Sequence, residues 1–107
     1  MARFDLYSNP SAKSKAKSPY LLDIQSNHLG DLHSRVVVPL TRVLGSYTPT
    51  TIARDLSPVF QIQGEEFLLE TPLLGALRIA LLGPAVGSLK SEQVRILSAL
   101  DRLFGGY

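Results

Sequence analysis

The sequence contains no cysteine, which excludes a disulfide framework and a metal site built on thiolates. It also lacks a long hydrophobic run. Its most apolar stretch, residues 73–86, is interrupted by Arg78, Gly83 and Pro84 and falls short of the roughly 18 residues that a membrane span needs. The first residues, MARFDLY, do not form the apolar segment of a signal peptide. We therefore expect a soluble, cytoplasmic protein with no membrane partner.

Motifs for common chemistries are missing as well. There is no phosphate-binding glycine loop, no G-x-S-x-G elbow around a serine, and no stripe of aromatic and basic residues for nucleic-acid stacking. Ser26, His28 and His33 suggest a hydrolase, but no acid stands in a recognisable orienting context. His28, Asp31 and His33 suggest a metal site, but such sites normally need a third or fourth ligand and regular spacing. A polar surface loop is the preferred interpretation. We expect no catalytic residue, no metal, no cofactor and no direct nucleic-acid binding.

What the sequence does contain is an ordinary globular composition with unevenly placed charge. Its 107 residues, 45% hydrophobic and 19% charged, suit a single domain over 1–107. The net charge is +2, and residues 1–42 carry six basic and three acidic side chains. The excess lies chiefly at Lys13, Lys15 and Lys17. A basic loop favours an acidic partner, although a solvated loop is the preferred interpretation of these three lysines.

Hydrophobic alternation predicts several strands in the first four fifths of the chain. We expect strands at 4–7 and 20–25 to pair around a flexible loop, 8–19, that has nothing to bury. RVVVPL (35–40) is the clearest strand, with Pro39 at an edge, a bulge or the strand's end. Further expected elements are a short helical piece at 51–55 among turns over 41–56, a hairpin of 58–63 and 65–70 around Gly64, and a strand at 76–83.

The last element is predicted to be a helix. Ser91 is the expected N-cap, Glu92 suits the first turn, and Gly105 is the expected terminating glycine. An apolar stripe of helical period runs through the segment, comprising Val94, Ile96, Leu97, Leu100, Leu103 and Phe104. The fold class is therefore mainly β, a small barrel or sheet with a C-terminal helix.

Five segments, in this order, resemble the CcdB family of toxin–antitoxin modules: FDLYSN, YLLDIQSN, RVVVPL, RDLSPVFQIQGEEF and ALDRLFGGY. The most specific part is D-[IV]-Q-S followed about a dozen residues later by R-x-V-[IV]-P-L. The departures are the loop 8–19, the region 41–50 and the last residues. The resemblance implies an SH3-like barrel with a C-terminal helix, the toxin fold shared by CcdB and MazF, and a homodimer.

The resemblance also implies a function. A CcdB-type toxin is not an enzyme. It is a topoisomerase poison that enters the dimeric A subunit of DNA gyrase and traps the complex in which DNA is cleaved. An antitoxin of the CcdA type, with a disordered acidic C-terminal segment, binds and removes it. We assign the antitoxin contact to Lys13, Lys15 and Lys17.

The family's working tip follows the helix and reads Trp-Gly-Ile, where this chain has Gly105, Gly106 and Tyr107. Replacing tryptophan by glycine removes a typical interface hot spot, and Tyr107 supplies a ring two residues further along. The gyrase-binding residues carried over with this tip are Asp101, Ser26, His28, Phe4 and Tyr7. For Phe4 and Tyr7 the alternative is ordinary strand packing, and for Asp101 it is a plain surface acid.

Two other functions remain open at this point. A MazF-like ribonuclease toxin would gather Arg35, Arg42 and Thr41 in one groove. A dimer of this fold that has lost gyrase poisoning would be in keeping with Gly105. In each case the apolar region 73–86 exceeds what a small barrel buries, so we expect an isologous dimer contact there.

Overall fold

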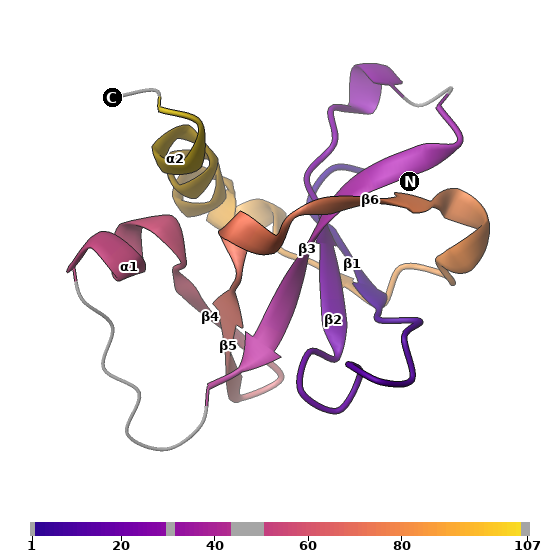
Figure 1. Cartoon of the computed structure of the whole chain (residues 1–107), viewed down its shortest axis with the longest axis horizontal. Coiled ribbons are helices and arrows are strands. Elements are labelled where there is room, and N and C mark those ends of the chain that lie inside the picture. Colours follow the sequence, from indigo (N-terminus) through magenta and orange to yellow (C-terminus); the bar gives the residue numbers. More distant parts are fainter. Residues whose placement is uncertain (1, 30–31, 44–50, 106–107) are drawn as a thin grey trace.

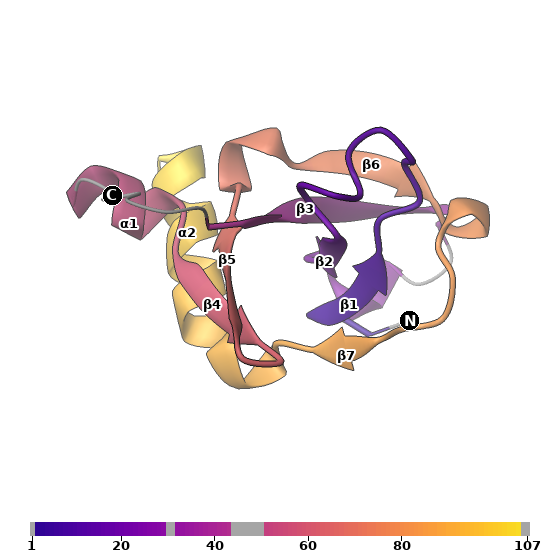
Figure 2. The same cartoon turned by 90° about the horizontal axis from the view of Figure 1, so that it is seen from below.

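The structure is a computed structural model that describes residues 2–29, 32–43 and 51–105. One antiparallel sheet forms most of it, with strand order β4-β5-β3-β2-β1-β7 and β6 paired to β3 (Figure 1). The strands are β1 (Asp5–Ser8), β2 (Tyr20–Asp23), β3 (Ser34–Arg42), β4 (Val59–Ile62), β5 (Glu65–Leu69), β6 (Gly75–Arg78) and β7 (Gly87–Ser88). The sheet curls into a half-barrel (Figure 2), which confirms the predicted class, mainly β with a C-terminal helix.

Helical elements connect and flank the strands. They are η1 (Asn27–Leu29), α1 (Thr51–Leu56), η2 (Thr71–Leu73), η3 (Ile79–Leu81), η4 (Lys90–Glu92) and α2 (Gln93–Phe104). The expected helical piece at 51–55 is confirmed as α1, while residues 44–50 lie outside the described part of the chain. The strand expected over 76–83 is only partly right, because β6 ends at Arg78 and the chain turns into η3. No helix in the described residues is long and apolar enough to cross a membrane.

Strand β3 is the central strand of the sheet and pairs with three other strands. Its first half pairs with β6 and its last three residues pair with β5, while β2 lies along its other side. The prediction that Pro39 lies at an edge, a bulge or an end is wrong, because Pro39 is inside this central strand. Its position falls between the β6 register, which stops at Val37, and the β5 register, which starts at Leu40. The missing N–H of proline is tolerated at this change of partner.

Both predicted hairpins are confirmed. Strands β1 and β2 pair with Leu6 opposite Leu22, and β4 and β5 pair around a two-residue turn. In that turn Gln63 (φ 52°) and Gly64 (φ 80°) are both left-handed, as a type I′ turn requires.

The prediction that loop 8–19 has nothing to bury is wrong. Asn9 and Ser18 are buried, and Asn9 Nδ2 donates to the Ser18 carbonyl at 2.8 Å and to Ser14 Oγ at 3.0 Å. Ser18 Oγ in turn shares a 2.7 Å hydrogen bond with Thr41 Oγ1 on β3. Hydrogen bonds from short polar side chains thus hold the loop in place, where buried apolar side chains would be expected to do so.

Helix α2 packs on the sheet with a narrower face than predicted. Ile96 and Ala99 are fully buried, with Leu100 packed beside them, whereas Val94 and Phe104 are 74% and 71% exposed. The expected single apolar stripe is therefore wrong, because its members divide between the core and the surface. The expected N-cap at Ser91 is also wrong, since η4 precedes the helix, but Gly105 ends it in the left-handed conformation (φ 77°) as predicted.

Candidate functional site

A groove of about 540 Å³ lies between α2, the segment that follows β2, and β3. Its walls carry apolar side chains that the fold leaves open to solvent, namely Leu29, Leu32, Leu97 and Phe104. Phe104 is the only exposed phenylalanine or tyrosine among the residues that the structure describes. A contiguous exposed apolar patch with a polar rim is typical of a protein-binding surface.

The groove brings together several residues that the sequence pointed to. Ser26, from the segment after β2, and Asp101, from α2, both line it, and His28 belongs to η1, next to Leu29. Gly105 directly follows Phe104 at the end of α2, and its N–H donates to the Asp101 carbonyl. Gly106 and Tyr107 lie outside the described residues.

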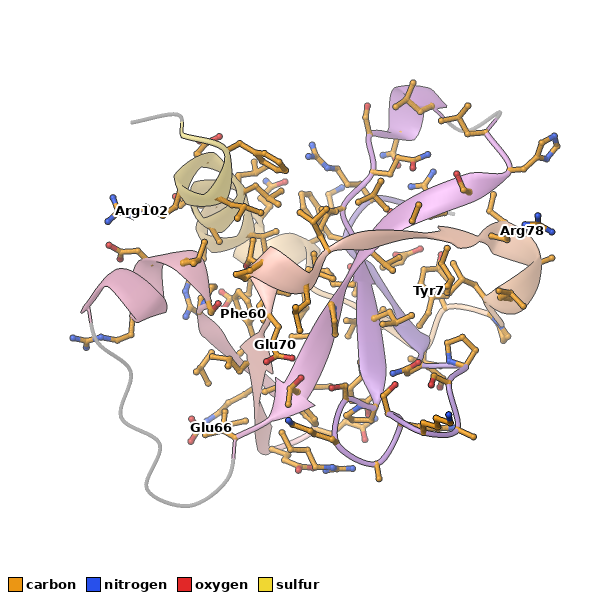
Figure 3. All side chains as sticks on the ribbon, in the orientation of Figure 1. Tyr7, Phe60, Glu66, Glu70, Arg78 and Arg102 are labelled. Atoms are coloured by element: carbon orange, nitrogen blue, oxygen red, sulfur yellow. The ribbon has the colours of Figure 1, made fainter. Side chains whose placement is uncertain are left out.

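Phe4 and Tyr7, by contrast, are not presented to a partner. Phe4 belongs to the hydrophobic core, although its φ of 74° is unusual for a bulky side chain. Tyr7 is buried as well, and this burial, followed by the negative charges of Asp5 and Asp23, raises its pKa above the usual 10.0. The alternative, that these residues pack inside the molecule, therefore fits both, with Tyr7 in β1 and Phe4 in the turn before it (Tyr7 is labelled in Figure 3).

Arg3 lines the groove and was missed by the sequence reasoning. Its guanidinium lies 5.1 Å from the centre of the Phe4 ring, and its Nε donates to the Ile24 carbonyl at 3.0 Å. Its backbone N–H donates to Asn27 Oδ1 at 2.8 Å. Arg3 thereby connects the N-terminal segment to the wall of the groove. In the sequence, its position next to Phe4, a candidate site residue, was the feature that could have pointed to it.

A buried polar network lies behind the same wall. Arg35 Nε and Nη2 donate to the two carboxylate oxygens of Asp23 at 2.8 and 3.0 Å, with both side chains removed from solvent. Asp23 Oδ1 also accepts from the Gln25 N–H at 3.0 Å. The sequence reasoning used these residues only as a family motif, DIQS followed by R, and did not foresee that they meet.

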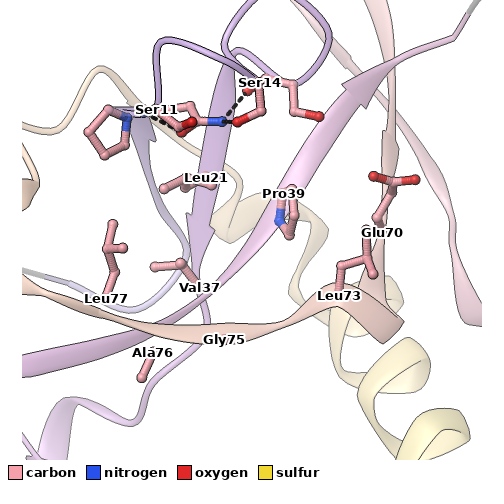
Figure 4. A pocket seen from close by; sticks show the side chains of 13 residues that line it. Ser11, Ser14, Leu21, Val37, Pro39, Glu70, Leu73, Gly75, Ala76 and Leu77 are labelled. Carbon is pink, nitrogen blue, oxygen red and sulfur yellow. Dashed lines mark hydrogen bonds between the residues drawn. The ribbon is translucent and has the colours of Figure 1, made fainter.

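A second pocket of about 340 Å³ lies between loop 9–18 and β6 (Figure 4). Leu21, Val37 and Leu77 give it apolar walls, and the Glu70 carboxylate, which accepts a 2.7 Å hydrogen bond from Thr41, lies on its rim. Lys13, Lys15 and Lys17 are exposed on the same loop. An apolar pocket next to a basic loop suits a partner that is both acidic and apolar.

The structure does not assemble the ribonuclease-like site. Arg35 and Arg42 are seven residues apart on β3, which at ~3.3 Å per residue places them about 23 Å apart. Arg35 is buried against Asp23, while Arg42 pairs with Glu65 at the surface. The hypothesis that these arginines share a groove with Thr41 is therefore wrong.

The alternative metal site has no support in the described part of the chain. No group of three His, Cys, Asp or Glu side chains that could hold a metal ion is found there, and Asp31 lies outside it.

Comparison with known proteins identifies the family of the chain. A model of the family described as CcdB protein matches residues 3–106. No curated protein matches the sequence. The family match covers nearly the whole chain, including the sheet, the groove and α2. The chain therefore belongs to the CcdB family, a family of toxins from toxin–antitoxin modules.

Proposed function

We propose that this protein is the toxin of a type II toxin–antitoxin module, which acts in the cytoplasm by binding the DNA gyrase A subunit and trapping the cleaved-DNA complex. The observation that carries the proposal is the open apolar groove at the end of α2. Its exposed Phe104 and Leu97 adjoin Asp101, Ser26 and the start of the tip. Exposed aromatic and apolar side chains at a pocket are the usual anchors of a protein interface.

The chemistry of the tip supports a modified contact. Gly105 has a φ of 77°, so a side chain at this position would strain the backbone. The ring that the family places here must therefore come from another residue. Phe104 precedes this glycine, and Tyr107 follows two residues later. Tyr107 is the residue that we propose replaces the missing tryptophan.

A homodimer is part of the proposal. Leu73, Leu81 and Val86 are each at least half exposed, which supports an isologous contact through residues 73–86. Sedimentation at micromolar concentration should give a dimer, and Leu81→Glu should shift it toward the monomer. A monomeric wild-type protein would contradict this part of the proposal.

Neutralisation by an antitoxin of the CcdA type is assigned to the other pocket. The apolar walls beside loop 9–18 offer a seat for apolar side chains, and Lys13, Lys15 and Lys17 offer charge to an acidic segment. This surface is separate in its lining residues from the groove at α2, and it shares Leu73 and Leu77 with the region of the proposed dimer contact.

The test is a calorimetric titration of the protein into the dimerisation domain of the gyrase A subunit. We expect binding by the full chain and a loss of well over tenfold in affinity when residues 105–107 are removed. Val94→Ala is the control. It alters an apolar side chain of α2 that is as exposed as Phe104 but does not line the groove, and the variant should bind normally. Absence of binding by the full chain would refute gyrase as the target.

The second candidate is a dimer of this fold that has lost gyrase poisoning. The glycine at position 105 is the observation that favours it, because no side chain stands where the family has its tryptophan. Expression in a host with sensitive gyrase distinguishes the two: growth arrest with intact total RNA supports the poison, and normal growth supports the second candidate.

A further inference from the structure

Gln25 is a buried side chain that links the two walls of the groove. Its Nε2 donates to the Leu29 carbonyl at 3.3 Å, and its Oε1 accepts from the Val36 N–H at 3.0 Å. Leu29 belongs to η1 on one wall, and Val36 belongs to β3 on another. One side chain thus holds these two parts of the binding surface at a fixed separation.

Arg35 and Asp23 hold Gln25 in turn. Arg35 Nη2 donates to the Gln25 carbonyl at 3.2 Å while it also binds Asp23, and Asp23 accepts from the Gln25 N–H. The main chain of Gln25 is therefore bound on both sides. Both hydrogen bonds are made to the backbone of Gln25, where the chain begins the segment that forms one wall of the groove.

The segment after Gln25 buries little apolar surface, and its other contacts include the hydrogen bond from the Arg3 N–H to Asn27 Oδ1. Asn27 and Leu29 are exposed and Ser26 is half-buried, so burial of apolar surface does not determine their conformation. Segments with few buried contacts open locally unless hydrogen bonds hold them. A buried ion pair is also a poor source of stability compared with an apolar pair of similar size, which points to a role in conformational specificity.

We propose that the network of Asp23, Gln25 and Arg35 positions the Ser26–Leu29 segment for partner binding. Gln25 and Arg35 are accordingly positioning residues for the gyrase-binding groove. This inference rests on the proposed function, since it takes gyrase as the partner. It adds two buried residues whose hydrogen bonds determine how well the groove fits the partner.

Gln25→Met tests the proposal, because methionine has a similar volume and forms neither hydrogen bond. The first measurement is amide hydrogen exchange at Leu29, whose N–H donates to the Ser26 carbonyl at 3.1 Å. We expect about tenfold faster exchange at Leu29, with the amides of β2 unchanged, and about tenfold weaker binding to the gyrase A dimerisation domain. Arg35→Lys, which keeps the charge but loses the fork geometry, should act in the same direction.

Phe60→Leu is the control for a merely structural effect. Phe60 is a core residue on β4, which is the terminal strand of the sheet, and its ring packs against the Arg95 guanidinium at 4.5 Å. It should lower the melting temperature while leaving Leu29 exchange and gyrase affinity unchanged. Equal loss of affinity in Phe60→Leu and Gln25→Met, or unchanged Leu29 exchange in Gln25→Met, would overturn the proposal. Failure of the wild-type protein to bind would instead overturn the proposed function.

Discussion

Breaking the buried pair between Asp23 and Arg35 should destabilise the protein severely. Asp23→Ala removes the acceptor of two guanidinium hydrogen bonds and of the Gln25 N–H, and leaves the Arg35 charge without its counter-ion. The side chains are 0% and 2% exposed, so water does not replace the lost partner. Removal of one partner from such a pair costs about 3–5 kcal/mol. That is a large part of the roughly 5–15 kcal/mol by which a domain of this size is stable.

Urea denaturation followed by circular dichroism measures this loss. We expect the midpoint to fall sharply with an unchanged slope, because the surface exposed on unfolding stays the same. The double variant Asp23→Leu with Arg35→Met should recover much of the stability, since it removes both charges and keeps apolar volume. A cost below about 1 kcal/mol for Asp23→Ala would refute the reasoning, because that is the value of a solvent-exposed pair.

Three further predictions concern other parts of the molecule. Thr71 Oγ1 is buried without a hydrogen-bond partner among the described residues, so Thr71→Val should raise the free energy of unfolding by about 1 kcal/mol in the same urea assay; a loss would contradict this. Burial raises the Tyr7 pKa, so with rising pH the phenol ionises in the unfolded chain before it ionises in the folded protein. The free energy of unfolding should therefore fall as the pH rises above 10, and Tyr7→Phe should reduce that fall in thermal melts. Changing Lys13, Lys15 and Lys17 together to Ala should slow antitoxin association at low salt and flatten its salt dependence in stopped-flow measurements, and unchanged rates would rule out steering by this loop.

Local patterns predicted the elements that local chemistry controls. The hairpin at Gly64 and the helix stop at Gly105 were both predicted, because left-handed backbone favours glycine wherever it occurs. The place of Pro39 was not, since it depends on where β6 ends and β5 begins along β3. That is a property of the sheet and not of the segment.

The candidate site was predictable to a smaller extent. Ser26 and Asp101 were singled out and do share a groove, but Tyr7 in β1 and Phe4 in the turn before it are both buried. Alternation along a strand shows that successive side chains lie on opposite faces of the sheet. It does not show that either face is exposed to solvent once the sheet curls. The link from Asp23 to Arg35 joins residues twelve apart on neighbouring strands, and no local pattern encodes it.

The apolar residues of α2 illustrate why an amphipathic pattern underdetermines function. Ile96 and Ala99 suffice to seat the helix on the sheet, and Val94, Leu97 and Phe104 remain outside the core. A helix that only needed to fold would carry polar residues at those outer positions, because exposed apolar groups gain nothing from the core. Leu97 and Phe104 are also the pair that lines the groove, next to Asp101. The exposed apolar side chains of this helix are therefore best explained by a partner that covers its C-terminal half. Leu97 and Phe104 are needed for binding that partner and not for folding.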